Sequence, residues 1–300
     1  MNVQKHGLEF YVNRGIEEAL AKIKIFAEDA KPERNRLHFH QCQHTKEVVR
    51  RTELILSAVR EIEPNLASRN NFQIGRLAAG FHDSVQEWVE EKIPDGARTK
   101  LFRRRLFGHN ERASIGEAVL FMNKVNEEAK EEIFSWPDKL LTAEAINVTI
   151  PSFDQEKFTV IQPNLSEKTS LVARALALAD LGTAGLDGYK SFIDDGNALF
   201  REENLDIFDA AHSRVSISQE DRGYFRERMI TWSESQPKFA EGRRTMLRFE
   251  LEGLPPKIKA RIWPLFNKFS ESIRMAKIIA AKRAKMSFEN LLYDFSFLEK

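Results

Sequence analysis

Residues 37–56, LHFHQCQHTKEVVRRTELIL, show the helical character that governs this chain. Apolar residues recur there every three or four positions, which predicts a helix with one buried stripe, formed by Val48, Val49, Leu54, Ile55, Leu56 and Val59. His44 lies one turn before Val48, so its imidazole is expected to point into the interior with that stripe. A buried polar ring needs a partner, and other segments of the chain supply candidates.

Helical periodicity also dominates the rest of the chain, whereas alternating strand-like runs are short and scarce, so we expect an all-α fold. Helices are expected near residues 8–28, 41–63, 70–90, 110–134, 137–147, 168–184, 187–202, 219–236, 238–250, 256–284 and 287–293. Residues 150–170 hold two prolines and lack a helical period, which predicts a loop with a short extended piece in FTVIQ. This loop leads into the helix that carries Asp180, where it could form a lid or a rim, or pack on the surface.

The composition describes a chain that can bury a large core and carries little net charge. Its 300 residues, 42% of them hydrophobic, suffice for one large domain or two modest ones. The 46 basic and 45 acidic side chains leave a formal charge of +1, which excludes a polycation that binds nucleic acid through overall charge. Cys42 is the single cysteine, so a disulfide framework and multi-cysteine metal sites are excluded. The sequence predicts neither a secretion signal nor a membrane span, and a cytoplasmic location is expected.

Three helical segments offer side chains that bind metals. His44 lies in the first, His82 and Asp83 follow RLAAGF in the second, and Asp180 closes the apolar run LVARALALAD. An unpaired carboxylate beside such an apolar run would be costly, and a bound cation would relieve that cost. Two imidazoles and two carboxylates suit a divalent cation and leave coordination positions open for water and phosphate. We therefore expect one divalent ion (Mn, Fe, Ni, Co, Zn or Mg) bound by His44, His82, Asp83 and Asp180.

Four segments, in chain order, resemble the HD-domain metal-dependent phosphohydrolase superfamily. HFHQCQHTKEVV is similar to its first ligand segment, RLAAGFHDSVQEWV to its HD segment, and ADLGTAG to its last ligand segment. HNERAS is similar to the asparagine-glutamate segment of the small phosphohydrolases in this superfamily, and it contains Asn110, Glu111 and Ser114. The resemblance covers roughly residues 35–195 and implies an HD-domain helical core with the same four metal ligands.

The resemblance also implies an activity: hydrolysis of a phosphate ester, of a nucleotide or another small phosphorylated metabolite, by water that the metal activates. Asp83 and Glu111 are the expected catalytic residues. Glu111 could orient or deprotonate the water, or could favour the positive N-terminus of its helix without taking part in chemistry.

The cations that would bind the substrate phosphate are less clearly marked in the sequence. Many family members place a lysine shortly after the HD pair, whereas this chain has Gln86 there. Arg112, Lys100 and Arg104 are the candidates for this role, because guanidinium and ammonium groups pair with phosphate oxygens. Arg103 and Arg105 belong to the same basic set, some of which could replace the missing lysine. A solvent-exposed turn around residues 100–110 is the alternative interpretation of this basic stretch.

Two further histidines lie near the predicted ligands. His40, one turn before His44, is interpreted as a residue that supports the ligands or packs beside them rather than as a ligand. His109 could be an extra ligand, or it could simply precede a helix that Asn110 caps. Family members with two metals have more histidines between the HD pair and the last aspartate, so one metal is favoured here.

Residues 1–195 are predicted to form the HD-type metal-binding domain, and residues 196–300 a helical accessory subdomain packed on it. Residues 257–285 contain nine Lys or Arg and one acid, Glu271, and could bind an anionic macromolecular partner or form a solvated face. Two alternatives to the hydrolase stay open: a non-catalytic HD-domain regulator or scaffold that binds a partner through these basic helices, and an oxygenase with paired iron. A homo-oligomer is compatible with each of them.

Overall fold

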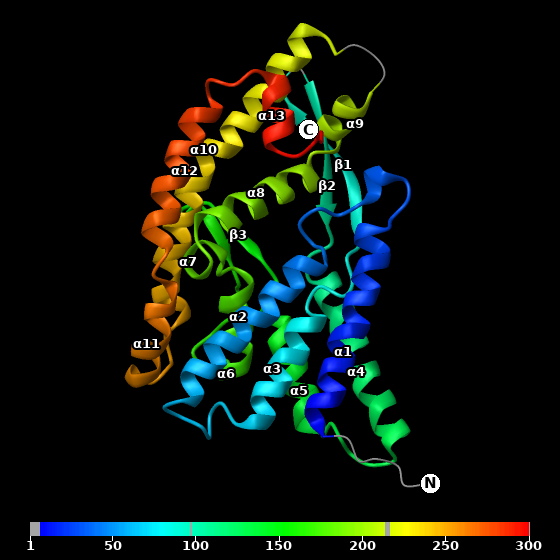
Figure 1. Ribbon diagram of the computed structural model, residues 1–300, viewed down its shortest axis with the longest axis vertical. Helices are drawn as coiled ribbons and strands as arrows, with labels where there is room; N and C mark the ends of the chain where they lie inside the picture. Colours follow the sequence, from blue (N-terminus) through cyan, green and yellow to red (C-terminus); the bar gives the residue numbers. More distant parts are fainter. Residues whose placement is uncertain (1–6, 97, 214–216, 300) are drawn as a thin grey trace.

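The computed structural model describes residues 7–96, 98–213 and 217–299, which are mostly helical, as predicted (Figure 1). The N-terminal half contains six of the longer helices: α1 (Leu8–Ile23), α2 (Cys42–Arg60), α3 (Arg69–Phe81), α4 (His109–Ala129), α5 (Trp136–Asn147) and α6 (Leu171–Asp180). α3 packs against α1, α2 and α5, while α2 and α5 both contact α6. The beginning of α2 and the ends of α3 and α6 will prove to carry the predicted metal ligands.

Short polar side chains begin several of these helices. The Ser68 hydroxyl accepts from the Asn71 N–H at the start of α3, and the Ser170 hydroxyl accepts from the Ala173 N–H at the start of α6. Ser135 caps α5, whose first turn contains Pro137, as the sequence predicts. These caps fix where the helices begin and therefore the direction in which their ends project.

The C-terminal half consists of α7 (Thr183–Leu186), α8 (Tyr189–Glu203), α9 (Leu205–His212), α10 (Gln219–Glu250), α11 (Pro256–Ile262), a 3-10 turn (Trp263–Phe266), α12 (Phe269–Arg283) and α13 (Phe288–Asp294). α10 and α12 lie side by side along one flank of the molecule (Figure 1). α8 contacts both of them and also reaches β2 (Arg98–Arg105). It therefore connects the C-terminal helices to the remainder of the fold.

The largest difference from the sequence prediction lies after Phe81. A helix was expected to continue to about residue 90, but α3 ends at Phe81 and β1 (Trp88–Asp95) pairs antiparallel with β2. Trp88 pairs with Arg105 and Asp95 pairs with Arg98. The Asp95-Gly96 dipeptide, with Gly96 at a φ of +62°, is a common hairpin turn sequence and was the signal that the helical interpretation missed.

The C-terminal helices differ from the prediction in three further ways. α10 runs unbroken through the buried Pro237, although separate helices were expected on either side of it. The helix expected over residues 256–284 is divided into α11, the 3-10 turn containing Pro264, and α12. α9 was not predicted. α10 continues through Pro237 because a proline removes only one helical hydrogen bond, and the packing of the buried helix around it outweighs that loss.

Residues 150–170 form the predicted loop, with a small hairpin of β3 (Ser152–Asp154) and β4 (Thr159–Ile161). β4 lies within FTVIQ, so the extended piece expected there is confirmed. The hairpin packs against α10. The long connection before α6 is therefore attached to the C-terminal half of the chain.

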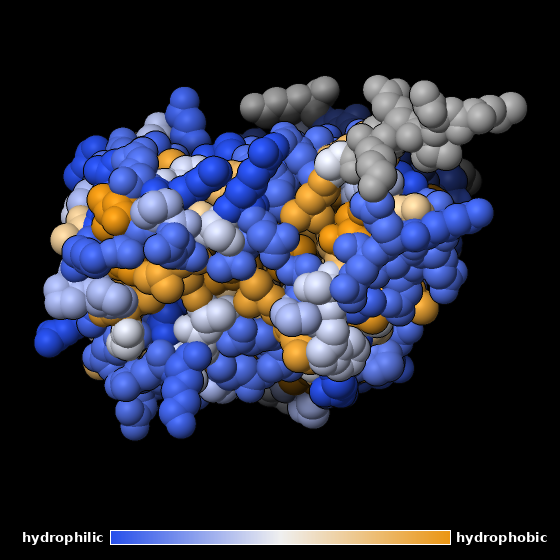
Figure 2. Space-filling model, turned by 90° about the horizontal axis from the view of Figure 1, so that it is seen from below, coloured by the Kyte–Doolittle hydropathy of each residue, from blue (hydrophilic) through white to orange (hydrophobic). Residues whose placement is uncertain are grey.

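One large apolar core joins α1–α6 with α10, α11 and α12, and a smaller one joins α8, α9, α10 and α13. The large core thus crosses residue 195, and the division into two units there stays a prediction. Figure 2 shows the molecule from below, with hydrophobic residues in a band between hydrophilic ones. Among the helices in the described ranges, none is both long enough and apolar enough for a membrane crossing.

Candidate metal centre

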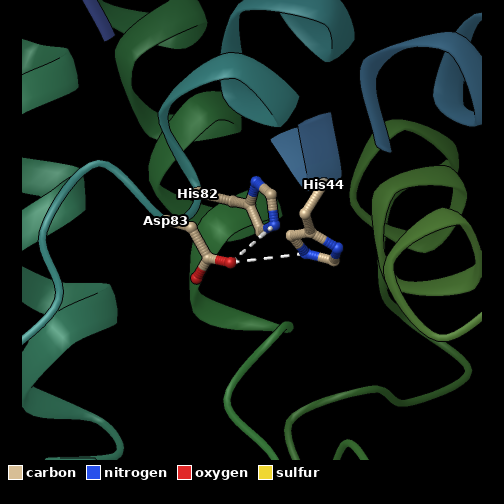
Figure 3. Close-up of side chains that lie close together, drawn as sticks. All are labelled: His44, His82 and Asp83. Atoms are coloured by element: carbon tan, nitrogen blue, oxygen red, sulfur yellow. Dashed lines mark ion pairs between the residues drawn. The ribbon is translucent and has the colours of Figure 1, made fainter. Parts of the chain in front are cut away.

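The three segments singled out in the sequence meet at one point. His44 lies in the first turn of α2, His82 directly follows α3, and Asp83 follows His82 (Figure 3). One ligand atom from each of these three buried residues lies within 4.8 Å of the other two, so the group could hold a metal ion. The expected convergence of these side chains is therefore observed.

Asp180, the last residue of α6, faces the same point from the other side. Its Oδ1 lies 3.5 Å from the Nε2 of His44 and 3.7 Å from the Nε2 of His82. The Oδ2 of Asp83 lies 3.4 Å and 3.3 Å from the same two nitrogens. Both carboxylates thus lie close to both imidazoles, which is the arrangement that a shared cation requires.

The hydrogen bonding of His82 orients a bare nitrogen towards this point. Its Nδ1 lies 2.8 Å from the carbonyl oxygen of Ala79, which can only accept, so Nδ1 carries a proton. In the neutral ring the lone pair is then on Nε2, a buried atom without a hydrogen-bond partner among the described residues. A backbone carbonyl that fixes the tautomer of a metal-binding histidine in this way is a common feature of metal sites.

The charges of the cluster favour a cation at its centre. Burial opposes protonation of His44, but the hydrogen bonds that its protonated ring donates to Asp180 and Asp83 outweigh it and raise the pKa of His44 to about 9. Burial likewise opposes protonation of His82, and the charge of Asp83 raises the pKa of His82 all the same. Asp83 is itself buried, yet His82 and His44 hold the pKa of Asp83 well below its usual range. The carboxylates thus attract positive charge to the imidazoles, and a metal ion could replace the protons.

Buried Arg51 fixes α6 against α2. Its Nε donates to the Oδ2 of Asp187 over 2.6 Å, and its Nη1 donates to the carbonyl of Ala179 over 3.2 Å. A Cβ on Gly182 would lie 2.5 Å from the carbonyl oxygen of Leu178, so the turn after Asp180 requires glycine. The small residues of ADLGTAG therefore serve to place Asp180.

The asparagine-glutamate segment positions the loop after the HD pair. Asn110 exchanges two hydrogen bonds of 3.0 Å with the backbone of Glu87, and the Ser114 hydroxyl accepts from the Val85 N–H over 3.1 Å. Gln86, which stands where many family members have lysine, donates to the Oδ1 of Asp83 over 2.7 Å. These contacts hold the Asp83 carboxylate towards the two histidines.

A chain of buried polar groups, whose mutual contacts the sequence did not predict, supports Asp83 from the other side. Arg105 at the end of β2 donates to the Oδ1 of Asp83 over 3.3 Å and to the Nε2 of His40 over 2.6 Å. Since Nε2 of His40 accepts, its Nδ1 carries the proton and donates to Glu202. His40 thus contacts Arg105 and Glu202, and it is not one of the residues that face the metal position.

The structure places the other predicted site residues in different surroundings. Glu111 is buried and accepts from the backbone N–H of Gly108, and both Glu111 and Lys100 line a cavity beside the metal cluster. Arg104 and Arg112 do not line this cavity: Arg104 pairs with Glu91 over 2.9 Å, and Arg112 is exposed. The Arg104 side chain lies outside the site because neighbouring strand residues, Arg104 and Arg105, point to opposite faces of the hairpin.

His109 is half exposed and pairs with Glu87 over 3.0 Å, outside the metal cluster. It begins α4 instead of offering a further ligand. Within the parts of the chain that the structure describes, the cluster contains no third histidine.

The cavity beside the cluster has a volume of about 650 Å³, and Asp83, Asp180, Arg105 and Glu111 are among its lining residues. Val160 of β4 also lines it, so the loop over residues 150–170 forms part of its rim, one of the roles that the sequence left open. Gln162 from the same loop donates to the Oδ2 of Asp180 over 3.4 Å. Small-molecule sites commonly have cavities of this size beside a few convergent polar groups.

Comparison of the chain with protein-family models found no match, and comparisons with curated proteins and with solved structures found no significant match. The resemblance to the HD-domain superfamily therefore rests on the motif residues of the sequence alone.

Proposed function

We propose that this chain is a divalent-metal-dependent phosphoester hydrolase with an HD-type helical core. The observation that carries the proposal is that His44, His82, Asp83 and Asp180 lie together in the fold. These are the four residues that the sequence motifs assign as metal ligands. The orientation of the bare Nε2 of His82 towards the two carboxylates supports it further.

In the proposed enzyme, His44, His82, Asp83 and Asp180 hold one cation. A divalent cation there supplies Lewis-acid chemistry, because it polarises phosphoryl oxygens and makes water more acidic. Arg105, which lines the cavity and contacts Asp83, supplies the positive charge that the family's lysine provides elsewhere. Glu111 places a carboxylate at the cavity wall, where it can orient water or accept its proton.

The regulator alternative, motivated by the missing lysine after the HD pair and by the long C-terminal extension, would bind its partner through the basic residues 257–285. Several of these side chains are paired within the fold: Lys257 with Glu63, Arg261 with Glu61, and Lys277 with Glu241. The paired-iron oxygenase needs further ligands, and among the described residues the metal-binding group contains only His44, His82 and Asp83, with Asp180 beside it. Both observations favour the hydrolase.

The proposal is tested by measuring the metal content of the purified protein together with phosphate release from a panel of phosphoesters. The wild type is compared with Asp83→Ala and with a control, His109→Ala, whose histidine lies outside the cluster. We expect phosphate release that depends on added metal, persists in the control and is lost in Asp83→Ala. Bound metal without turnover on any ester would support the regulator, and redox-active paired iron would support the oxygenase.

A further inference from the structure

The cavity beside the metal cluster has two chemically different parts. Metal-binding and charged residues come from the ends of α3 and α6, the start of α4 and the end of β2, and further charged residues, among them Asp195 and Glu203 on α8 and Arg228 on α10, also line the cavity. Aromatic rings form much of the remaining wall: they include Phe102 on β2, Phe153 on β3, Phe200 on α8, and Trp232 and Phe239 on α10. The cavity therefore presents one polar end and a broad apolar wall.

Most polar side chains in the apolar part already have partners within the protein. Lys100 pairs with Asp95 over 3.0 Å, the Thr183 hydroxyl donates to Asp195 over 2.9 Å, and Arg228 pairs with Asp206. Asn204, beside Arg228, bonds the Phe200 carbonyl and accepts from Arg228. The indole N–H of Trp232 has no hydrogen-bond partner among the described residues, so a free donor remains on this wall, but most of the lining surface is apolar.

A ligand whose polar groups found no partners here would lose the free energy of those hydrogen bonds on leaving water. An aliphatic chain has no such groups, and each methylene transferred from water to an apolar wall is favourable. The size of the cavity, about 650 Å³, is far larger than a phosphate group alone needs.

We infer that the ligand of this cavity is an amphiphilic phosphoester, with a long aliphatic chain against the aromatic wall and its phosphate at the metal cluster and Arg105. The position of the phosphate rests on the proposed hydrolase function. The position of the aliphatic chain rests on the cavity alone. A nucleotide, the substrate class that the family resemblance implies, is the competing ligand, because aromatic rings also stack on nucleobases.

The inference is tested by binding ethyl-, hexyl- and decylphosphonate, which cannot be hydrolysed as esters, to the Mn²⁺-loaded protein in a calorimeter. We expect binding to tighten about threefold to fourfold for each added methylene until the cavity is filled. Adenosine monophosphate should bind more weakly than decylphosphonate. Equal affinity across the series, or tighter binding of the nucleotide, would overturn the inference.

A variant that fills the cavity locates the effect. Leu199 on α8 is a lining residue, and Leu199→Trp should remove the gain from chain length while leaving ethylphosphonate binding unchanged. Leu120→Trp is the matched control, because Leu120 is 63% exposed on α4 and does not line the cavity. The control should bind the series as the wild type does. An unchanged series in Leu199→Trp would contradict the assigned binding place.

If Leu199→Trp does not fold, a second pair of variants tests the same binding position. Phe153 at the cavity rim and Phe249 outside the cavity are 45% and 48% exposed, so Ala at either site should be tolerated. Phe153→Ala should weaken decylphosphonate binding several-fold, and Phe249→Ala should not. The two proposals can fail separately: chain-length dependence without phosphate release contradicts only the hydrolase, and phosphate release without chain-length dependence contradicts only the amphiphilic ligand.

Discussion

Arg105 contacts Asp83, with its Nη2 donating to the carboxylate Oδ1 over 3.3 Å. The same guanidinium donates to His40, so the end of β2 and the segment before α2 both support one expected metal ligand. Residues that orient metal ligands commonly contribute 10-fold to 100-fold to metal affinity or activity. The β1–β2 hairpin therefore helps to orient Asp83, one of the expected metal ligands.

Arg105→Ala should lower metal affinity about 10-fold to 100-fold, because Asp83 loses an orienting donor. Arg104→Ala is the matched control, since Arg104 precedes Arg105 on β2 and pairs with Glu91 on the other face. Titration of both variants with Mn²⁺ measures the difference. Equal losses in the two variants would show that the effect is not specific to the Asp83 contact.

Asn110→Ala should destabilise the protein by about 1–3 kcal/mol, because the buried backbone groups of Glu87 lose their partner. Urea unfolding monitored by circular dichroism gives this free energy. His109→Ala, at the neighbouring exposed position, should change it little. If Asn110→Ala unfolds at the same urea concentration as the wild type, Asn110 does not hold the loop.

The raised pKa of His44 makes the stability of the metal-free protein depend on pH. Burial opposes the protonated form, but Asp180 and Asp83 outweigh it, and the pKa of His44 rises to about 9. Its contribution to stability is fully present below the unfolded pKa of about 6.5 and is lost as pH rises to about 9. We expect the free energy of unfolding to fall by about 1–3 kcal/mol over this window.

The comparison for this prediction is His44→Gln, which should not show the same fall between pH 6.5 and 9. Metal affinity should change in the opposite direction and rise over the same window, because the metal displaces the protons. A wild type and a His44→Gln variant with parallel stability profiles would contradict the assigned pKa of His44.

Glu203 gives a second pH-dependent prediction. Its pKa is raised in the folded protein, whereas the pKa of a paired carboxylate is usually lowered. Burial and the neighbouring charge of Glu202 raise the pKa of Glu203 to about 8, so the folded protein holds a proton that the unfolded chain releases. This group costs stability increasingly as pH rises from about 4.5 to about 8. Glu203→Gln should therefore unfold at a higher temperature than the wild type at pH 8.

At pH 4.5 the Glu203→Gln variant and the wild type should be nearly equal in stability, and the difference should grow by at most about 1.4 kcal/mol per pH unit. Glu234→Gln is the control, because Glu234 is exposed and lies on a different helix, α10. A constant difference at all pH values would point to packing instead of ionisation.

The sequence identified the residues of the cluster but not the groups that support it. His44 and Asp180 were found because each belongs to a strongly periodic apolar run, where a polar side chain is conspicuous. Glu202 lies 162 residues after His40, and no local pattern could show that the two meet. Arg105 was named only among the basic residues that could replace the missing lysine, and its contact with Asp83 was not foreseen because its strand was interpreted as a basic turn, although Asp95-Gly96 marks a hairpin.

The cavity was also not predicted from the sequence, because it too depends on contacts between residues that are distant in the chain. Its aromatic wall combines residues from β2, β3, α8 and α10, each of which reads locally as an ordinary buried or partly buried position. Only the packing of α10 against the hairpin and α8 brings them to one surface. Periodicity predicts which face of an element is buried, but not which faces enclose a space.

The central claim is that His44, His82, Asp83 and Asp180 bind one divalent metal ion. It is tested most directly by the metal-to-protein ratio of purified wild type and His82→Ala, each incubated with Mn²⁺, desalted and analysed by plasma mass spectrometry. The account predicts about one ion per chain in the wild type and almost none in His82→Ala. Equal metal content in the two proteins, or none in the wild type, would contradict it.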